Sequence, residues 1–278
     1  MTEETSPSRS LRVLLAEDNK VNQQFATLIL NKAGHSVEIA ANGRQAVDAL
    51  NRSDFDVVLM DIQMPELDGL QATLQIRAMP EPKRSIPIIA VTAHAMIGAR
   101  EEYLAAGMDE YISKPFQPAT LLSALAKFPV QKSEPSPTSV SEKSSEEIVV
   151  TPIDKLPVLD LDQLRTLASV FSLSKVRTLA ALYMLDVDAR LVLIEQCRSA
   201  NDFDGVSRQA HMIVSTAGNL GAKQSSALAC SLEVSCIKRD DGHSDALIAA
   251  LHASCRVSSS ALKEWLNEVT SASIAING

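Results

Sequence analysis

The chain has 278 residues, of which 46% are hydrophobic and 4% aromatic, and its formal net charge is −8 at pH 7. That length is typical of about two domains. The acidic balance argues against nucleic acid as the main partner, because phosphate backbones are bound by basic surfaces. No apolar stretch is long enough to cross a bilayer, and the first residues lack the pattern of a signal peptide. We therefore expect a cytoplasmic protein without membrane insertion.

Four short apolar runs in the first half of the chain have the pattern of strands. Each run continues without alternation, which is typical of a parallel sheet whose two faces are both covered by helices. We therefore predict an α/β domain with a doubly wound parallel sheet over residues 10–128. The four runs span residues 11–16, 56–60, 86–91 and 109–113.

Polar residues follow each of these runs directly. In open α/β sheets, ligands bind at the edge where the carboxyl ends of the strands meet. We therefore expect the side chains that follow the four runs to converge there. They are Glu17, Asp18, Asp61, Thr92 and Lys114.

These residue types suit a site for magnesium and phosphate. Mg²⁺ prefers oxygen ligands and is commonly held by one or two carboxylates, which Glu17, Asp18 and Asp61 supply. Asp61 stands alone at its strand end and is the natural nucleophile toward phosphorus. Lys114 can neutralise the charge that spreads over the phosphoryl oxygens, and the Thr92 hydroxyl can hydrogen-bond one of them.

Each residue also has an ordinary interpretation. An acidic pair in a loop is usually only solvated, and Asp68-Gly69 is usually only a turn. Lys114, just before Pro115, is in a common place for a surface lysine. Four motifs in this order, each at a strand end, favour the functional interpretation.

Four strings of this sequence resemble the receiver domain of two-component response regulators. The resemblance covers roughly residues 10–128, is closest to receivers that accompany hybrid histidine kinases, and implies a flavodoxin-like fold with five parallel strands. The strings are residues 16–19, 60–69, 91–96 and 106–115.

The resemblance also implies a role for individual residues. Asp61 would be the phosphoacceptor and Asp18 a direct Mg²⁺ ligand, with Glu17 assisting. The backbone carbonyl of Gln63 would complete the protein's share of the coordination. Two switch positions of the family correspond to Thr92 and Tyr111.

The composition changes sharply after the first domain. Residues 129–157 are rich in Ser, Pro and Glu and have little apolar content. Such a segment cannot bury enough surface to offset the entropy of ordering, so we predict a disordered linker.

Residues 158–270 have the pattern of an all-α four-helix bundle. We expect a long helix over residues 174–199, followed by a helix with Asp204 as its N-cap. The inward positions of the long helix are predicted to be Leu179, Leu182, Leu185, Ala189, Val192 and Cys197.

The helix after Asp204 carries an apolar stripe at three-four spacing, which belongs in a core. His211 lies beside this stripe, and we therefore predict it on an exposed side. A histidine in such a position is more often an ordinary surface residue. The stripe consists of Val206, Ala210, Ile213, Ala217 and Leu220.

The string around this histidine, residues 210–222, resembles the histidine-phosphotransfer (HPt) domain. The resemblance covers roughly residues 158–270 and implies that His211 is a phosphohistidine. The family usually has a lysine three residues after the histidine and a glycine one further on, where this chain has Val214 and Ser215. Loss of the lysine predicts slower transfer. Ser215 is small enough to leave a partner room, and Arg208 is the candidate for a substitute charge.

Three functions compete. In a phosphorelay protein, Asp61 accepts phosphoryl from an upstream histidine kinase, and His211 exchanges it with the aspartate of a receiver-domain response regulator. In a regulatory binding protein, phosphorylation changes the receiver surface, and the helical domain only binds a partner. An aspartate-based phosphatase is disfavoured, because such enzymes have a second aspartate where this chain has Gln63. The sequence lacks a kinase nucleotide motif, so we predict a phosphorelay protein that is not an enzyme.

Overall fold

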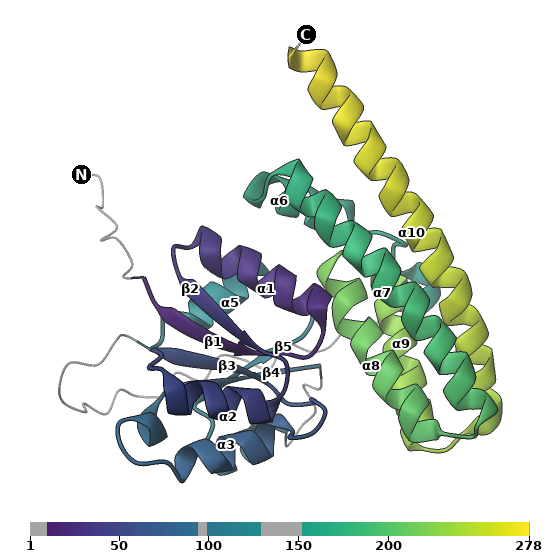
Figure 1. The fold of residues 1–278 in the computed structure, drawn as a ribbon. Helices are drawn as coiled ribbons and strands as arrows, with labels where there is room; N and C mark the ends of the chain where they lie inside the picture. The colour runs from purple at the N-terminus through teal and green to yellow at the C-terminus, as the bar shows by residue number, and fades with distance from the viewer. Residues whose placement is uncertain (1–9, 94–98, 129–151, 278) are drawn as a thin grey trace.

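A computed structural model describes residues 10–93, 99–128 and 152–277 and shows two domains side by side (Figure 1). The N-terminal domain is α/β and the C-terminal domain is entirely helical. Most of the predicted linker, residues 129–151, lies outside the described residues.

The N-terminal sheet has five parallel strands in the order β2-β1-β3-β4-β5, which confirms the predicted fold class. Its register aligns the strand ends, since Ala16 pairs with Met60, Asp61 with Val91 and Thr92 with Ser113. The residues that follow the strands therefore meet at one edge. The strands are β1 Arg12–Ala16, β2 Ser36–Ala40, β3 Val57–Asp61, β4 Ile88–Thr92 and β5 Glu110–Ser113.

Helices cover both faces of this sheet. Along β1, Val13 and Leu15 pack into the core under α1 and α5, whereas Leu14 and Ala16 pack into a second core under α2, α3 and α4. Both faces are buried, which is why the strands have no polar alternation. The helices are α1 Lys20–Lys32, α2 Gly43–Arg52, α3 Gly69–Arg77, α4 Ala99–Ala105 and α5 Pro118–Leu125, with a 3-10 helix η1 at Lys83–Ser85.

The helical domain contains the predicted four-helix bundle. Helix α8 packs between α7 and α9, and α10 closes the bundle against α9 and α7. The elements are a 3-10 helix η2 at Ile153–Lys155, then α6 Leu161–Val170, α7 Leu173–Ser199, α8 Phe203–Asn219, α9 Lys223–Ile237 and α10 Asp241–Asn277.

Two local predictions in this domain are wrong. The segment before residue 158 is ordered in part, because it forms η2 and the Leu156 carbonyl accepts a hydrogen bond of 2.7 Å from Gln224 of α9. The N-cap of α8 is Asp202, whose carboxylate accepts from the backbone N–H of Gly205 at 2.8 Å. Asp204 lies within the first turn instead.

The inward face of α7 also differs from the prediction. Of the six predicted positions only Leu179 is fully buried, and Leu185 is 70% exposed. Both sets recur on average at about the 3.6-residue period of a helix, but the predicted set is centred on a different side of α7. The buried residues are Val176, Leu179, Ala180, Tyr183, Val187, Leu191 and Ile194.

Helix α1 lies between the sheet and the bundle (Figure 1). It packs against α7 and α8, and the apolar core beneath α1 and α5 continues into the helical domain. The first domain therefore covers one side of α8 and the rest of the bundle covers the other.

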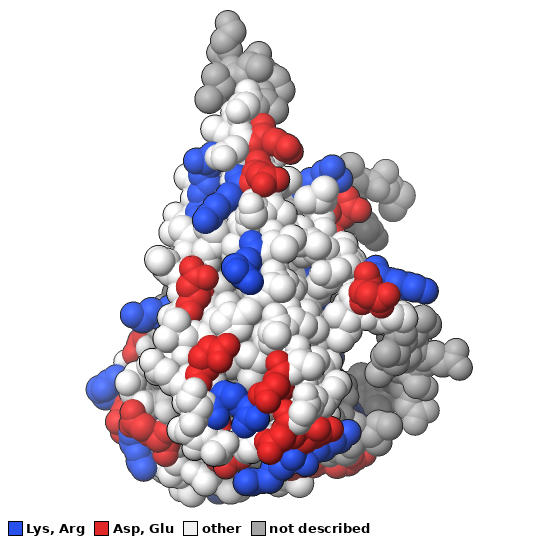
Figure 2. All heavy atoms as spheres, turned by 90° about the vertical axis from the view of Figure 1, so that its right-hand side faces the viewer, with Lys and Arg blue, Asp and Glu red and all other residues white. Residues whose placement is uncertain are grey.

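Figure 2 shows the side of the helical domain that is turned away from the sheet. Basic and acidic side chains are interspersed on this face and gather most densely toward its lower end. Among the ion pairs of the helical domain, Arg198 lies 2.5 Å from Asp245 and 3.6 Å from Asp241. This face has mixed charge, unlike the basic stripe typical of nucleic-acid-binding proteins.

Gly69 allows α3 to begin against the end of β3. Its N–H donates to the Ile62 carbonyl at 2.9 Å, and a Cβ at this position would lie 2.1 Å from the carbonyl oxygen of Asp61. We expect Gly69→Ala to lower the free energy of unfolding by about 1–3 kcal/mol, because the added methyl must displace backbone. Urea denaturation followed by circular dichroism measures this loss.

Gly242→Ala is the matched control, because a Cβ there meets no atom within 4 Å. It should leave the free energy of unfolding unchanged or raise it by up to about 1 kcal/mol, since alanine is a better helix former than glycine. Equal stability of the two variants would contradict the close approach of α3 to β3.

Candidate functional site

Three carboxylates meet at the carboxyl edge of the sheet. Glu17 and Asp18 follow β1, Asp61 ends β3, and one carboxylate oxygen from each lies within 4.8 Å of the others. Asp61 is 1% and Glu17 3% exposed. The convergence predicted from the strand ends is therefore present for the acidic residues.

Lys114, which follows β5, bridges two of these carboxylates. Its Nζ lies 2.6 Å from Oε2 of Glu17 and 2.6 Å from Oδ2 of Asp61. Burial acts to lower the pKa of Lys114, but the charges of Asp61 and Glu17 outweigh it and raise that pKa above its ordinary value. The ammonium group therefore stays charged at neutral pH.

The acidic pair after β1 is strongly affected by burial. Burial is the largest influence on Glu17 and raises its pKa to about 7, although the charge of Lys114 acts to lower it. Burial, and then the charge of Glu17, raise the pKa of Asp18 to about 6, whereas Lys114 and Arg190 act to lower it. Both carboxyl groups hold protons more tightly than exposed ones, mainly because burial disfavours their charged forms and in part because each lies near another carboxylate.

The site fits a hard divalent cation. Asp18 Oδ1 is buried and, among the described residues, has no hydrogen-bond partner. A buried oxygen without a partner is costly unless a cation or water satisfies it. Glu17, Asp18 and Asp61 are the residues that could hold Mg²⁺. The Gln63 backbone N–H donates to Asp61 Oδ1 at 3.3 Å, and its carbonyl remains a predicted ligand.

Thr92 and Tyr111, the predicted switch residues, lie on adjacent strands: Thr92 ends β4, and Tyr111 is the second residue of β5, where it pairs with Ala90. The Thr92 hydroxyl is buried and lies 3.0 Å from the phenol oxygen of Tyr103 on α4. Tyr111 is half-buried against the core under α2, α3 and α4. Sequence reasoning missed Tyr103, because nothing in the pattern of α4 marks it as a partner of β4.

His211 lies on α8 and is only 4% exposed, so the prediction of an exposed side is wrong. Its Nδ1 lies 3.0 Å from Oε1 of Glu233 on α9. Facing an ionised carboxylate, Nδ1 would donate, and this tautomer of the imidazole has its lone pair on Nε2. Sequence reasoning missed Glu233, since the pairing depends on how α8 and α9 pack.

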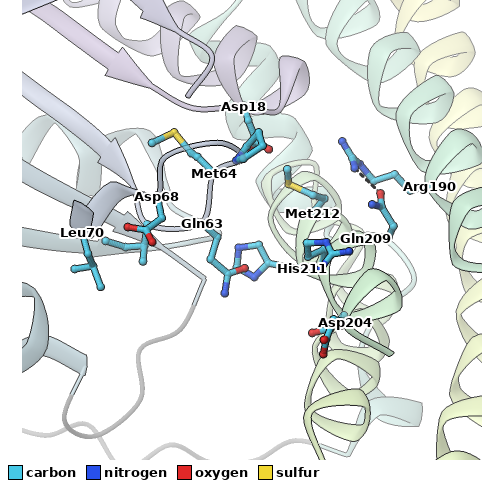
Figure 3. A pocket seen from close by; sticks show the side chains of 14 residues that line it. Asp18, Gln63, Met64, Asp68, Leu70, Arg190, Asp204, Gln209, His211 and Met212 are labelled. Carbon is cyan, nitrogen blue, oxygen red and sulfur yellow. Dashed lines mark hydrogen bonds between the residues drawn. The ribbon is translucent and has the colours of Figure 1, made fainter. Parts of the chain in front are cut away.

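A cavity of about 650 Å³ lies between the two domains (Figure 3). Asp18 and Gln63 line it from the sheet edge, and Arg190, Gln209 and His211 line it from α7 and α8. His211 and Asp18, one member of the acidic cluster, therefore face a common space.

Two arginines line this cavity in different ways. Arg190 is 17% exposed and donates to Asp186 at 3.0 Å and to Gln209 at 2.8 Å. Arg208, the candidate from sequence, is 67% exposed and lies 3.7 Å from Asp202. Of these two arginines, Arg190 is the one whose charge acts to lower the pKa of Asp18. Its position depends on α7, so the local sequence around His211 could not reveal it.

Comparisons with known proteins identify the first domain. Residues 13–126 match the family model "Response regulator receiver domain". The receiver domain of the sensor histidine kinase PA1611 from Pseudomonas aeruginosa PAO1, crystallised with a magnesium ion in its active-site cleft, is 44% identical. The match covers 43% of this chain and 98% of that one, with a TM-score of 0.41. The family-model match shows that residues 13–126 form a receiver domain.

The full-length relatives are much longer proteins. Sensor histidine kinase GacS of Pseudomonas protegens is 31% identical over 93% of this chain and 28% of its own length. Aerobic respiration control sensor protein ArcB of Escherichia coli is 28% identical over 80% of this chain and 27% of its own length. The chain thus spans less than a third of these relatives. Within the described ranges, none of the helices is both long and apolar enough to cross a membrane.

Metal binding at the acidic cluster should depend strongly on pH. Mg²⁺ must displace the protons that Glu17 and Asp18 hold below their raised pKa values of about 7 and about 6. The Mg²⁺ affinity should fall roughly tenfold or more from about pH 8 to about pH 6, since a carboxyl one unit below its pKa is about nine-tenths protonated. Isothermal titration calorimetry measures this affinity.

Glu17→Gln is the control for this pH dependence. It removes the group that titrates near pH 7 but keeps a side chain of similar size. The remaining pH dependence should be confined to the lower range set by Asp18. A parent protein with the same Mg²⁺ affinity at both pH values would contradict the assignment of the metal site.

Proposed function

We propose that this chain is a phosphorelay signalling protein. Asp61 accepts a phosphoryl group from an upstream histidine kinase, and His211 exchanges that group with a receiver aspartate, in the first place with Asp61 of the same chain. The observation that carries this proposal is the shared cavity, lined by Asp18 from the acidic cluster and by His211 from α8.

The residues divide the chemistry of the first step. An Asp61 carboxylate oxygen attacks phosphorus and forms the new P–O bond as the P–N bond to the kinase histidine breaks. Lys114 neutralises charge on the phosphoryl oxygens from its place 2.6 Å from Asp61. Mg²⁺, held by Glu17, Asp18 and Asp61, would supply further charge neutralisation when bound.

In the second step, Nε2 of His211 attacks the phosphorus of aspartyl phosphate. A P–N bond forms, the P–O bond breaks, and Asp61 regains its carboxylate. Glu233 accepts a hydrogen bond from the Nδ1–H group of His211, and this tautomer has its lone pair on Nε2. It also balances the positive charge that develops on the ring during attack.

Arg190 replaces the cation that the HPt family usually carries after its histidine. Val214, at the family's lysine position, is buried and apolar. Arg190 instead brings a charge to the cavity from α7, where Asp186 and Gln209 hold it in place. An oriented guanidinium suits phosphoryl oxygens because it offers several donors in a plane.

On this proposal the chain is a phosphoacceptor and phosphotransfer protein rather than an ATP-dependent enzyme. Its partners are a histidine kinase upstream and a receiver-domain response regulator downstream. It would work in the cytoplasm, where such kinases obtain ATP. The second candidate, a regulatory binding protein, is favoured by the apolar Val214.

Labelling with acetyl phosphate and Mg²⁺ tests the two phosphorylation sites. The parent should carry base-labile aspartyl phosphate and acid-labile phosphohistidine, because Asp61 passes the group to His211. Asp61→Asn should lose both, and His211→Gln should keep only the aspartyl phosphate. Phosphopeptide analysis after acid and base treatment separates the two species.

The labelling pattern also decides between the two candidate functions. Aspartyl phosphate without phosphohistidine, in the parent alone and with added receiver domains, would make the helical domain a binding module only. Full labelling of Asp61→Asn would contradict the phosphoacceptor assignment itself.

The two cavity arginines should differ in their effect on transfer. Arg190→Ala should slow the appearance of phosphohistidine at least about tenfold, because a charge near the transferring group stabilises the transition state. Arg208→Ala should change the rate by less than about twofold, since solvent screens an exposed charge. Rapid-quench kinetics from aspartyl phosphate measure both rates.

Arg190→Lys keeps the charge and should recover part of the rate. If Arg208→Ala slowed transfer more than Arg190→Ala, the family's missing cation would be replaced by Arg208 and not by Arg190.

A further inference from the structure

A buried polar network joins the two domains across α1 and α8. The amide nitrogen of Asn22 on α1 donates to Ser215 Oγ at 3.0 Å, and the amide oxygen of Asn22 accepts from Asn219 Nδ2 at 3.2 Å. Asn22 is 2% exposed, and Ser215 and Asn219 are each 1% exposed. Each hydrogen bond therefore forms only when the domains are docked and water is excluded.

The same asparagine also reaches the acidic site. Its amide nitrogen lies 3.1 Å from Oε1 of Glu17, whose other oxygen lies 2.6 Å from Lys114. The carboxylate requires a donor, so Glu17 determines which end of the Asn22 amide faces it. The opposite end of the amide must then accept, and Asn219 supplies the donor.

This geometry accounts for the serine that departs from the HPt pattern. A glycine at position 215 would offer no hydroxyl, and the Asn22 amide would lose a partner in a buried interface. Ser215 accepts from Asn22 and donates to the Met212 carbonyl at 3.2 Å. Its hydroxyl therefore matches this receiver's own α1.

A second contact holds the backbones close together. A Cβ at Gly218 of α8 would lie 2.4 Å from Cγ and 2.6 Å from Cβ of Pro115, the residue after Lys114. Contacts this short require Pro115 or α8 to move. Gly218→Ala should therefore push the two domains apart by steric clash. It does so without substituting Asn22, Ser215 or Asn219.

We propose that Asn22 couples docking of the helical domain to metal binding at the acidic site. When docked, Ser215 and Asn219 fix the Asn22 amide, and Asn22 in turn fixes the Glu17 carboxylate in the orientation that completes the acidic cluster. Docking and Mg²⁺ binding then strengthen each other by the same factor, since coupling between two binding equilibria is reciprocal. The inference rests on the metal site and does not require phosphoryl transfer.

The test measures Mg²⁺ affinity by calorimetry and docking by hydrogen exchange of α1, both on the full chain without phosphodonor. Gly218→Ala and Ser215→Ala should each speed exchange in α1 and weaken Mg²⁺ binding about fivefold, a typical size for coupling between sites. Mg²⁺ should slow exchange of α1 in the parent. Ser225→Ala, which removes a buried hydroxyl that interacts with Ser254, Ser258 and Cys255 of α10, should match the parent.

A double variant distinguishes two ways in which docking could strengthen Mg²⁺ binding: through the Asn22 hydrogen bonds, or through burial of the acidic site alone. With Asn22→Ala already present, adding Gly218→Ala should produce no further loss of Mg²⁺ affinity. An equal loss in both backgrounds would show that burial alone couples the domains and would overturn the proposal. The proposal would also be overturned if Gly218→Ala sped hydrogen exchange in α1 but left the Mg²⁺ affinity unchanged. It would be overturned as well if no variant altered hydrogen exchange in α1.

Discussion

The buried ammonium group of Lys114 holds together the carboxyl ends of three strands. Its Nζ lies 2.6 Å from Glu17 after β1 and 2.6 Å from Asp61 at the end of β3, while Lys114 itself follows β5. One ammonium cannot neutralise three carboxylates, so Asp18 remains with a buried oxygen that lacks a partner among the described residues. Burial, together with this charge imbalance, raises the pKa values of Glu17 and Asp18 and makes the site suitable for a divalent cation.

Helix α8 is the second constraint, because both of its sides are covered. The bundle buries the apolar stripe through Ala210 and Ile213, and α1 covers the side that carries Ser215. A helix end buried on two sides needs small or hydrogen-bonded residues, which explains Gly218 against Pro115. The same packing brings His211 to the cavity that Asp18 lines from the sheet edge. The contact between the domains and the position of His211 are therefore consequences of one interface.

The family-model match covers the first domain, at residues 13–126, and does not extend into the helical domain. The geometry of the two domains explains this difference. The receiver residues follow strand ends, so their order along the chain is constrained by the sheet and matches a family model over residues 13–126. In the helical domain the cation faces the cavity from α7 and the histidine's partner, Glu233, comes from α9. Residues contributed by three helices leave a weaker linear signature than residues placed at four strand ends.

Local patterns were sufficient for the parallel sheet, for the convergence of the acidic residues and for the α8 stripe, because strand ends and helical periodicity are properties of short segments. They did not determine which row of α7 is buried, where Leu185 proved exposed. Nor could they reveal the burial of His211, the position of Arg190 or the pairing of Asn22 with Ser215. These depend on residues as many as 193 positions apart in the chain, and contacts at that separation are selected by the complementary surfaces of two folded domains.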